Sequence, residues 1–137
     1  MPQSIIIPNS KSPGTNAVNR TTTFTGQVWS QMVVSSGNVA IGNNVFMPCA
    51  KTNWHTHEGG QMLYVTVGSG WICDRGGEPR RIKAGDLVWA EPGTTHWHGA
   101  DENSFMSHLA VGIGKTTWLE AVEEEEEEGQ SEEASSA

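Results

Sequence analysis

The sequence has little cysteine, no long apolar run and no surplus of positive charge. Cys49 and Cys73 are the two cysteines of a 137-residue chain, and no apolar secretory segment precedes them. We expect both thiols to be reduced and to pack as small buried apolar side chains, because neither lies in a recognisable activating motif. The apolar stretch at residues 5–7 is far too short to cross a membrane. No basic patch indicates nucleic acid. The expected protein is soluble and cytoplasmic, with neither nucleic acid nor a membrane as its partner.

The formal charge of −8 is concentrated at one end of the chain. Residues 1–119 carry 8 Lys+Arg and 7 Asp+Glu, whereas residues 120–137 carry 9 acidic residues and no basic one. The last segment also ends in Gly, Ser and Ala and cannot build a core. Residues 1–23 are rich in Pro, Ser, Asn, Gly and Thr. We therefore predict a flexible N-terminal arm over 1–23, one folded domain over 24–119 and a disordered acidic tail over 120–137.

Between the arm and the tail, β-prone segments alternate with turn signals. Residues 27–34 and 39–47 are expected to form a hairpin about the turn-type cluster at 35–38. Further strands are expected at 61–67, 71–74, 87–90 and 104–113, with glycines separating the first two. No long helix is expected before Thr116, where a helical segment could begin. Turns that recur about every eight to twelve residues predict an all-β domain, an antiparallel barrel or sandwich.

Four of the five histidines lie in two short blocks, HTH at residues 55–57 and HWH at 96–98. A lone histidine in a β-protein is usually an ordinary hydrogen-bonded residue, but independent scatter rarely places four in this way. Side chains two residues apart on a strand leave the same face, and an amide follows the first block after a two-glycine turn. Imidazole nitrogens and an amide oxygen suit a first-row divalent ion. We predict His55, His57, Gln61 and His96 as the metal ligands.

The blocks HTHEGGQ and GDLVWAEPGTTH resemble the two motifs of cupins, which surround a metal ion inside a small β-barrel. Together with WHTH and HWHGA they are similar to the single-domain cupins that include manganese-dependent hydroxynitrile lyases, over about residues 24 to 120. The resemblance implies an antiparallel jelly-roll barrel and Mn²⁺, although Fe²⁺, Ni²⁺, Co²⁺ or Zn²⁺ would fit the same donors. Two positions depart from the motifs: Cys49 replaces a frequent glycine, and Glu91 replaces a frequent proline.

Neutral imidazoles and an amide leave a bound divalent ion its full charge, so it would be a stronger Lewis acid than one held by a carboxylate. His98 shares the strand face of His96, and the resemblance also places His108 in the pocket. Either could be the general base near neutral pH, and the resemblance favours His108. The function implied is a metal-dependent lyase that cleaves or forms a carbon–carbon bond of a small organic molecule, as in cyanohydrin chemistry. An Fe-dependent oxygenase or a non-catalytic metal- or ligand-binding barrel remain as alternatives.

Because alternate side chains of a strand face the same side, the sequence also predicts a small, mainly apolar chamber beside the ligands, where a small-molecule substrate would bind. The expected wall residues are Gly42, Asn44, Phe46, Leu63 and Val65.

Exposed β-faces that carry residues such as Tyr64 and Trp71 are expected to join copies of the chain. The sequence thus predicts a homodimer or a homotetramer.

Overall fold

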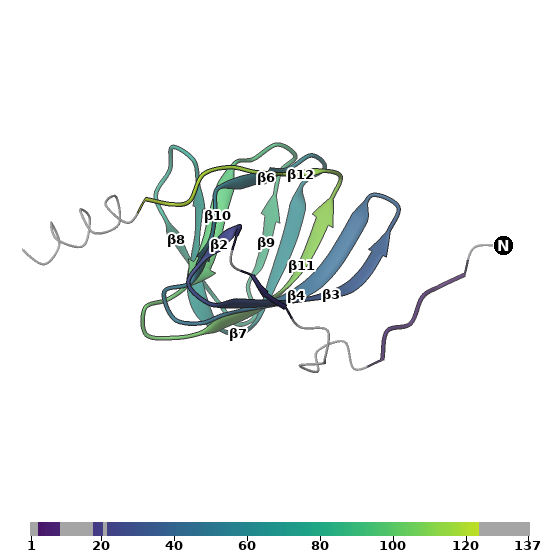
Figure 1. Ribbon diagram of the computed structural model, residues 1–137, viewed down its shortest axis with the longest axis horizontal. Coiled ribbons are helices and arrows are strands. Elements are labelled where there is room, and N and C mark those ends of the chain that lie inside the picture. Colours follow the sequence, from purple (N-terminus) through teal and green to yellow (C-terminus); the bar gives the residue numbers. More distant parts are fainter. Residues whose placement is uncertain (1–2, 9–17, 21, 124–137) are drawn as a thin grey trace, which may run out of the picture.

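The computed structural model describes residues 3–8, 18–20 and 22–123, and its regular structure consists of β-strands (Figure 1). The strands are β1 (Val18–Arg20), β2 (Phe24–Thr25), β3 (Val28–Ser36), β4 (Val39–Phe46), β5 (Lys51–Thr52), β6 (His55–His57), β7 (Gln61–Asp74), β8 (Arg80–Lys83), β9 (Leu87–Ala90), β10 (His96–Ala100), β11 (Met106–Ile113) and β12 (Thr116–Trp118). Among the described residues, no helix has the length and apolar character that crossing a membrane requires.

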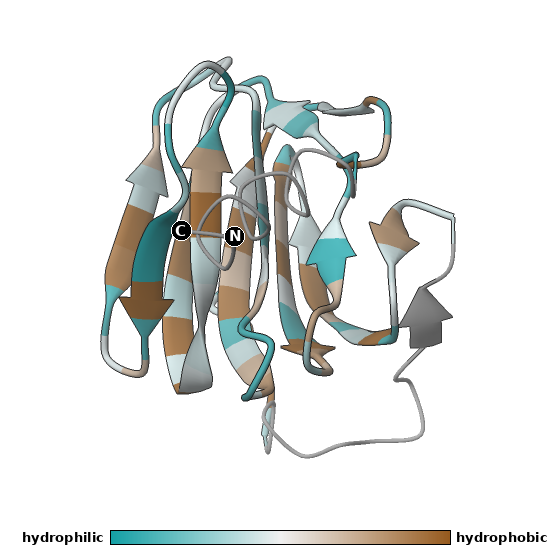
Figure 2. Cartoon of the chain, turned by 90° about the vertical axis from the view of Figure 1, so that its left-hand side faces the viewer, coloured by the Kyte–Doolittle hydropathy of each residue, from teal (hydrophilic) through white to brown (hydrophobic). Residues whose placement is uncertain are grey.

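All strand pairs are antiparallel, and they wrap into a nearly closed barrel, as the turn spacing predicts (Figure 1). The path through the sheet is β1-β3-β4-β11-β7-β10-β5-β2, and β6, β8, β9 and β12 pair beside it. The expected hairpin is β3–β4, closed at Gly37, whose φ of 60° suits a glycine. Figure 2 shows apolar and polar bands alternating along the longer strands, the pattern of a sheet with one buried face.

Strand β7 runs without interruption from Gln61 to Asp74, so the expected break at residues 68–70 is wrong. Its first half pairs with β11 and its second half with β10, which makes β7 the bend between the two walls of the barrel. The glycines serve this bend: Gly68 has a φ of +81°, and a Cβ there would lie 1.9 Å from the carbonyl oxygen of Phe105. They mark a close backbone approach and a change of direction within one strand.

The helix expected to begin at Thr116 is also wrong, because Thr116–Trp118 is strand β12. Strand β12 pairs with β6 and places Thr116 opposite His57 and Trp118 opposite His55. Tertiary pairing therefore overrides the local preference of this short segment.

Cys73 is buried and free, as expected, whereas Cys49 is free but exposed, against expectation. Cys49 has a φ of 69°, the backbone conformation that favours glycine, and it stands where the motif often has one.

Most of the predicted arm and tail, at 1–2, 9–17, 21 and 124–137, lies outside the described residues. Within the arm segment, β1 pairs with β3. Within the tail segment, Val122 is buried against Trp54, Cys73 and Trp97.

The interior side chains of the barrel lie in successive rungs across β3, β4, β11 and β7. One end is filled by Val28, Phe46 and Met106, which are fully buried and in register with one another. Burying such side chains stabilises the fold by roughly 1.5–3 kcal/mol each. Three further rungs lead away from this apolar core; they contain Ser30, Asn44, His108 and Val65, then Met32, Gly42, Ala110 and Leu63, and finally Ala40, Gly112 and Gln61.

Candidate metal centre

The four predicted ligands come from three neighbouring strands and point into the barrel. His55 and His57 lie on β6, His96 lies on β10 directly opposite His55, and Gln61 begins β7. All four side chains are buried. Gly60, with a φ of +95°, forms the turn that carries the chain from β6 back into β7. Local turn chemistry and antiparallel pairing thus gather two distant motifs in one place.

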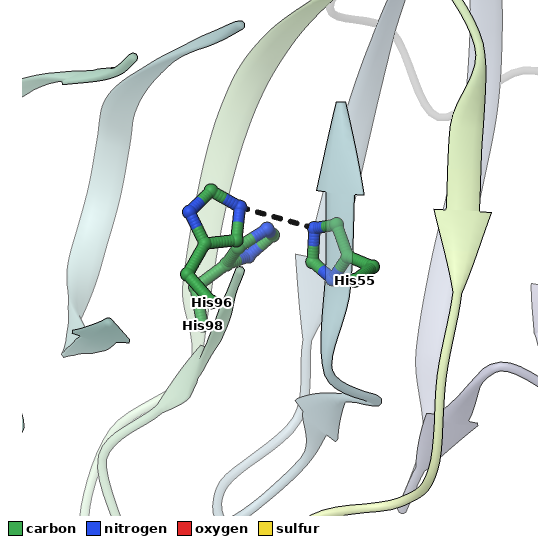
Figure 3. A group of neighbouring side chains, drawn as sticks. All are labelled: His55, His96 and His98. Carbon is green, nitrogen blue, oxygen red and sulfur yellow. Dashed lines mark hydrogen bonds between the residues drawn. The ribbon is translucent and has the colours of Figure 1, made fainter. Parts of the chain in front are cut away.

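Three of these side chains converge on one point. His96 Nε2 lies 3.2 Å from His55 Nε2 and 3.0 Å from Gln61 Oε1. An octahedral ion with ligand bonds of roughly 2.1 Å would hold adjacent donors about 3.0 Å apart, whereas a tetrahedral ion would hold them about 3.4 Å apart. The observed spacings of 3.0 and 3.2 Å lie within this range, so the three donors are close enough to share one ion. Figure 3 shows how His55 and His96 face each other from opposite strands, with His98 beside them.

The tautomer of His55 is determined by its backbone contact. The carbonyl oxygen of Asn53 lies 2.8 Å from His55 Nδ1, so Nδ1 carries the proton and Nε2 keeps its lone pair. Such a lone pair, directed at His96 and Gln61, is what a metal ligand requires.

His57 Nδ1 contacts a side-chain hydroxyl instead, which can either donate or accept the hydrogen bond. Thr116 Oγ1 lies 3.0 Å from His57 Nδ1, while His57 Nε2 is buried and has no hydrogen-bond partner among the described residues. The ring centre of His57 is 5.1 Å from that of His55 and 6.2 Å from that of His96. An unpaired buried nitrogen beside two converging imidazoles fits a ligand role, since burying a polar group without a partner is unfavourable.

The two histidines proposed for proton transfer form a pair. His108 Nε2 lies 3.1 Å from His98 Nδ1, and both side chains are buried. His98 lines the central cavity, whereas His108 lies behind it against Phe46, with ring centres 5.1 Å apart. A nitrogen of His98 also lies within 4.8 Å of nitrogens of His55 and His96, so these three form a histidine cluster that could hold a metal ion.

Burial keeps all five imidazoles neutral. Desolvation is the main cause that lowers the pKa of His55 and of His57 to about 4, that of His96 to about 3 and that of His108 to about 4. Desolvation, with the neighbouring charge of His108, holds the pKa of His98 well below its usual range. Neutral rings at pH 7 present lone pairs both to a metal and to a substrate proton.

A cavity of about 590 Å³ opens beside this cluster and reaches His55, His57, Gln61 and His98. One wall consists of small residues, namely Ala40, Gly42, Ala110 and Gly112. Phe24 and Trp118 also line it, with ring centres 5.6 Å apart. Of the expected wall residues, Gly42 and Asn44 line the cavity, whereas Phe46, Leu63 and Val65 are fully buried in the core.

Sequence reasoning missed the side chains that support the ligands. Thr116 contacts His57, and the ring centre of Trp118 lies 4.7 Å from that of His55. Ser30 donates a hydrogen bond to Asn44 in the cavity wall. These contacts join residues far apart in the chain, and no short motif signals them.

Comparisons with known proteins show to which family the chain belongs. A model of the cupin domain family matches residues 45–112. The chain is 46% identical over 92 residues to an (R)-mandelonitrile lyase from Granulicella tundricola, which covers 64% of this chain and 70% of the relative. Its fold is similar to that of a cupin-like protein from Thermotoga maritima, with a TM-score of 0.78, 36% identity and coverage of 84% and 93% of the two chains. A predicted oxalate decarboxylase from the same organism, with a TM-score of 0.68, 22% identity and coverage of 81% and 100%, shares the fold. The chain belongs to the cupin superfamily.

Proposed function

We propose that this cupin is a metal-dependent lyase that cleaves or forms a carbon–carbon bond next to a hydroxyl-bearing carbon, as hydroxynitrile lyases do. The observation that carries the proposal is the cavity, which is lined by His55 and Gln61, whose donors converge with that of His96, and by a further neutral histidine, His98. The similarity to an (R)-mandelonitrile lyase supports this reaction class.

His55, His57, Gln61 and His96 are the proposed ligands of one divalent ion. The bound ion would supply Lewis-acid polarisation of a substrate oxygen. Mn²⁺ is the proposed ion because the resemblance to manganese-dependent hydroxynitrile lyases implies it, and imidazole and amide donors also fit other first-row divalent ions. Neutral donors leave the ion its full positive charge. Gln61 is neutral, whereas a glutamate at this position would offset part of that charge.

The histidine pair is the proposed route for the proton. When His98 Nδ1 donates to His108 Nε2, His98 Nε2 presents a lone pair to the cavity, where it can accept the hydroxyl proton of a cyanohydrin. The carbon–carbon bond then breaks, its electrons leave with the cyanide, and the cyanide takes the proton from His98. The products are a carbonyl compound and hydrogen cyanide, and the pair ends as it began. In this scheme His98 contacts the substrate. His108 accepts the hydrogen bond from His98 Nδ1 and so keeps His98 in the tautomer whose Nε2 has a free lone pair.

The direct test combines metal analysis with an activity screen. Protein produced without added metal would be reconstituted separately with Mn²⁺, Fe²⁺, Ni²⁺, Co²⁺ and Zn²⁺ and assayed for cleavage of mandelonitrile. We expect one ion per chain, the highest rate with Mn²⁺ and loss of both in a His55→Ala/His57→Ala variant. Full metal occupancy in that variant would refute the ligand set. Oxygen consumption by the Fe²⁺ form, without cyanohydrin cleavage, would support the oxygenase alternative instead.

A second ligand set is favoured by one observation, the proximity of nitrogens of His55, His96 and His98. If His98 were a ligand, His98→Ala would lose the ion and His57→Ala would retain it. The proposed set requires the opposite result, so these two single variants distinguish the alternatives by metal content alone.

A further inference from the structure

One interior rung of the barrel is polar over most of its circumference. Ser30 is in register with Asn44, and Asn44 is in register with His108. His108 is hydrogen-bonded to His98, whose backbone nitrogen donates to Thr52 Oγ1 over 3.2 Å. We call these five residues the polar rung. The next rung toward the core is apolar, and burying polar groups beside it is unfavourable unless they have hydrogen-bond partners.

Within the polar rung, Asn44 has spare donor capacity. Ser30 Oγ donates to Asn44 Oδ1 over 2.5 Å, which orients the amide and occupies its oxygen. Among the described residues the amide nitrogen of Asn44 donates no hydrogen bond. Both side chains line the central cavity. The histidines of the rung, by contrast, are paired with each other, so Asn44 is the member that can offer N–H groups to a ligand.

The wall between Asn44 and the predicted ligands leaves room for a ring. Strand β11 passes from Gly112, in the rung of Gln61, to His108, in the rung of Asn44, and these four steps span about 13 Å. Gly112 and Ala110 are the interior residues along this stretch. A Cβ on Gly112 would lie only 3.1 Å from His57 Nδ1, so a larger residue would crowd the chamber.

The rings of Phe24 and Trp118 also line this cavity. An aromatic ring could therefore lie against them, with one end at His55 and Gln61 and the other at Asn44.

We propose that Asn44, oriented by Ser30, donates a hydrogen bond to an oxygen at the far end of the substrate. The site then prefers aromatic compounds that carry an ether or hydroxyl oxygen opposite the reacting carbon over compounds without one. The proposal rests on the proposed function only in assigning the reacting end of the substrate to the proposed metal ligands His55 and Gln61.

The test measures binding, so that it does not depend on catalysis. Two probes of matched shape, 4-methoxybenzyl alcohol and 4-ethylbenzyl alcohol, differ in one oxygen acceptor. Isothermal titration of the metal-loaded full chain should show the methoxy probe binding about three- to tenfold more tightly, the range for one neutral hydrogen bond. Asn44→Leu, which keeps the size and removes the donor, should bring the ratio to about one.

The matched control is Asn43→Leu, the same change on the opposite face of the same strand, which should keep the wild-type ratio. Ser30→Ala should lower the ratio partway, because the amide loses its fixed orientation. If Asn44→Leu does not fold, Asn44→Ala removes the donor for both probes alike.

Two results would overturn the subsite: a wild-type ratio near one, or a ratio that the Asn44 variants leave unchanged. Absence of binding of both probes would overturn it as well. If instead the ratio behaves as expected and no cyanohydrin is cleaved, the subsite stands and the lyase proposal fails.

Discussion

Acidification should destabilise the metal-free protein already at pH values well above those at which carboxylates titrate. All five histidines are buried, and burial lowers the pKa of His55, His57 and His108 to about 4 and that of His96 to about 3. In the unfolded chain these groups return to about 6.5. Because the folded pKa is the lower one, the unfolded state binds more protons below pH 6.5. The stability is therefore fully present above pH 6.5 and is lost as the pH falls.

The expected loss is large for a domain of this size. Between pH 6.5 and 5.5, one histidine whose pKa falls from 6.5 to about 4 on folding costs about 1 kcal/mol of unfolding free energy. The four histidines with values near 3 or 4 then cost about 4 kcal/mol together, and the lowered pKa of His98 adds to this loss. Single domains are stable by only about 5–15 kcal/mol, so the apoprotein should lose a large part of its stability within one pH unit.

Urea unfolding of chelator-treated protein at pH 7.5, 6.5 and 5.5, followed by tryptophan fluorescence, measures this loss. A His108→Asn variant is the matched control, because it removes one buried titrating group and should reduce the loss between pH 6.5 and 5.5 by about 1 kcal/mol. A free energy of unfolding that stays constant within about 1 kcal/mol from pH 7.5 to 5.5 would refute the reasoning. It would mean that the folded protein accepts these protons, which buried imidazoles should not do.

Three further predictions concern single parts of the molecule. Thr116→Val should weaken metal retention against a competing chelator about tenfold or more, and Thr116→Ser should restore it, because the hydroxyl orients His57; equal retention in both variants would exclude this role. His98→Ala and His108→Ala should keep the metal and lower cyanohydrin turnover by about a hundredfold, and if neither does, general-base catalysis by histidine is wrong. Removal of residues from Glu124 onward should leave the melting temperature nearly unchanged; a large fall would show that this segment docks on the barrel.

The sequence predicted what depends on local patterning. Alternation and turn residues identified the β3–β4 hairpin and the all-β class, and the rule that residues two apart share a strand face brought His55 and His57 to the same side. Sequence patterning gave wrong predictions where pairing with distant strands determines the local structure. The glycines at 68 and 70 predict an interruption, whereas in the structure they let β7 bend past other backbone segments.

The supporting contacts of the site were beyond sequence reasoning for a related reason. Thr116 reaches His57 because β12 pairs with β6, and Ser30 reaches Asn44 because β3 pairs with β4 in one particular register. A shift of one residue in either pairing would turn these side chains away. The register between strands that are distant in the sequence depends on the packing of the whole barrel. The cytoplasmic location, the homodimer or homotetramer and the identity of the ion stay predictions.

The pairing of β6 with β10 also explains why histidines from the two motifs can take different roles. His55 and His96 lie opposite each other, so His57 and His98 extend from this central pair in opposite directions. Gln61 is in register with Gly112, and Gly112 lies against the ring of His57, which places Gln61 on the His57 side. In the proposed ligand set, His57 would therefore complete the coordination of an ion bound by Gln61 and the central pair. His98 would then lie between the ion and His108, and because it also lines the cavity, it is the proposed proton acceptor.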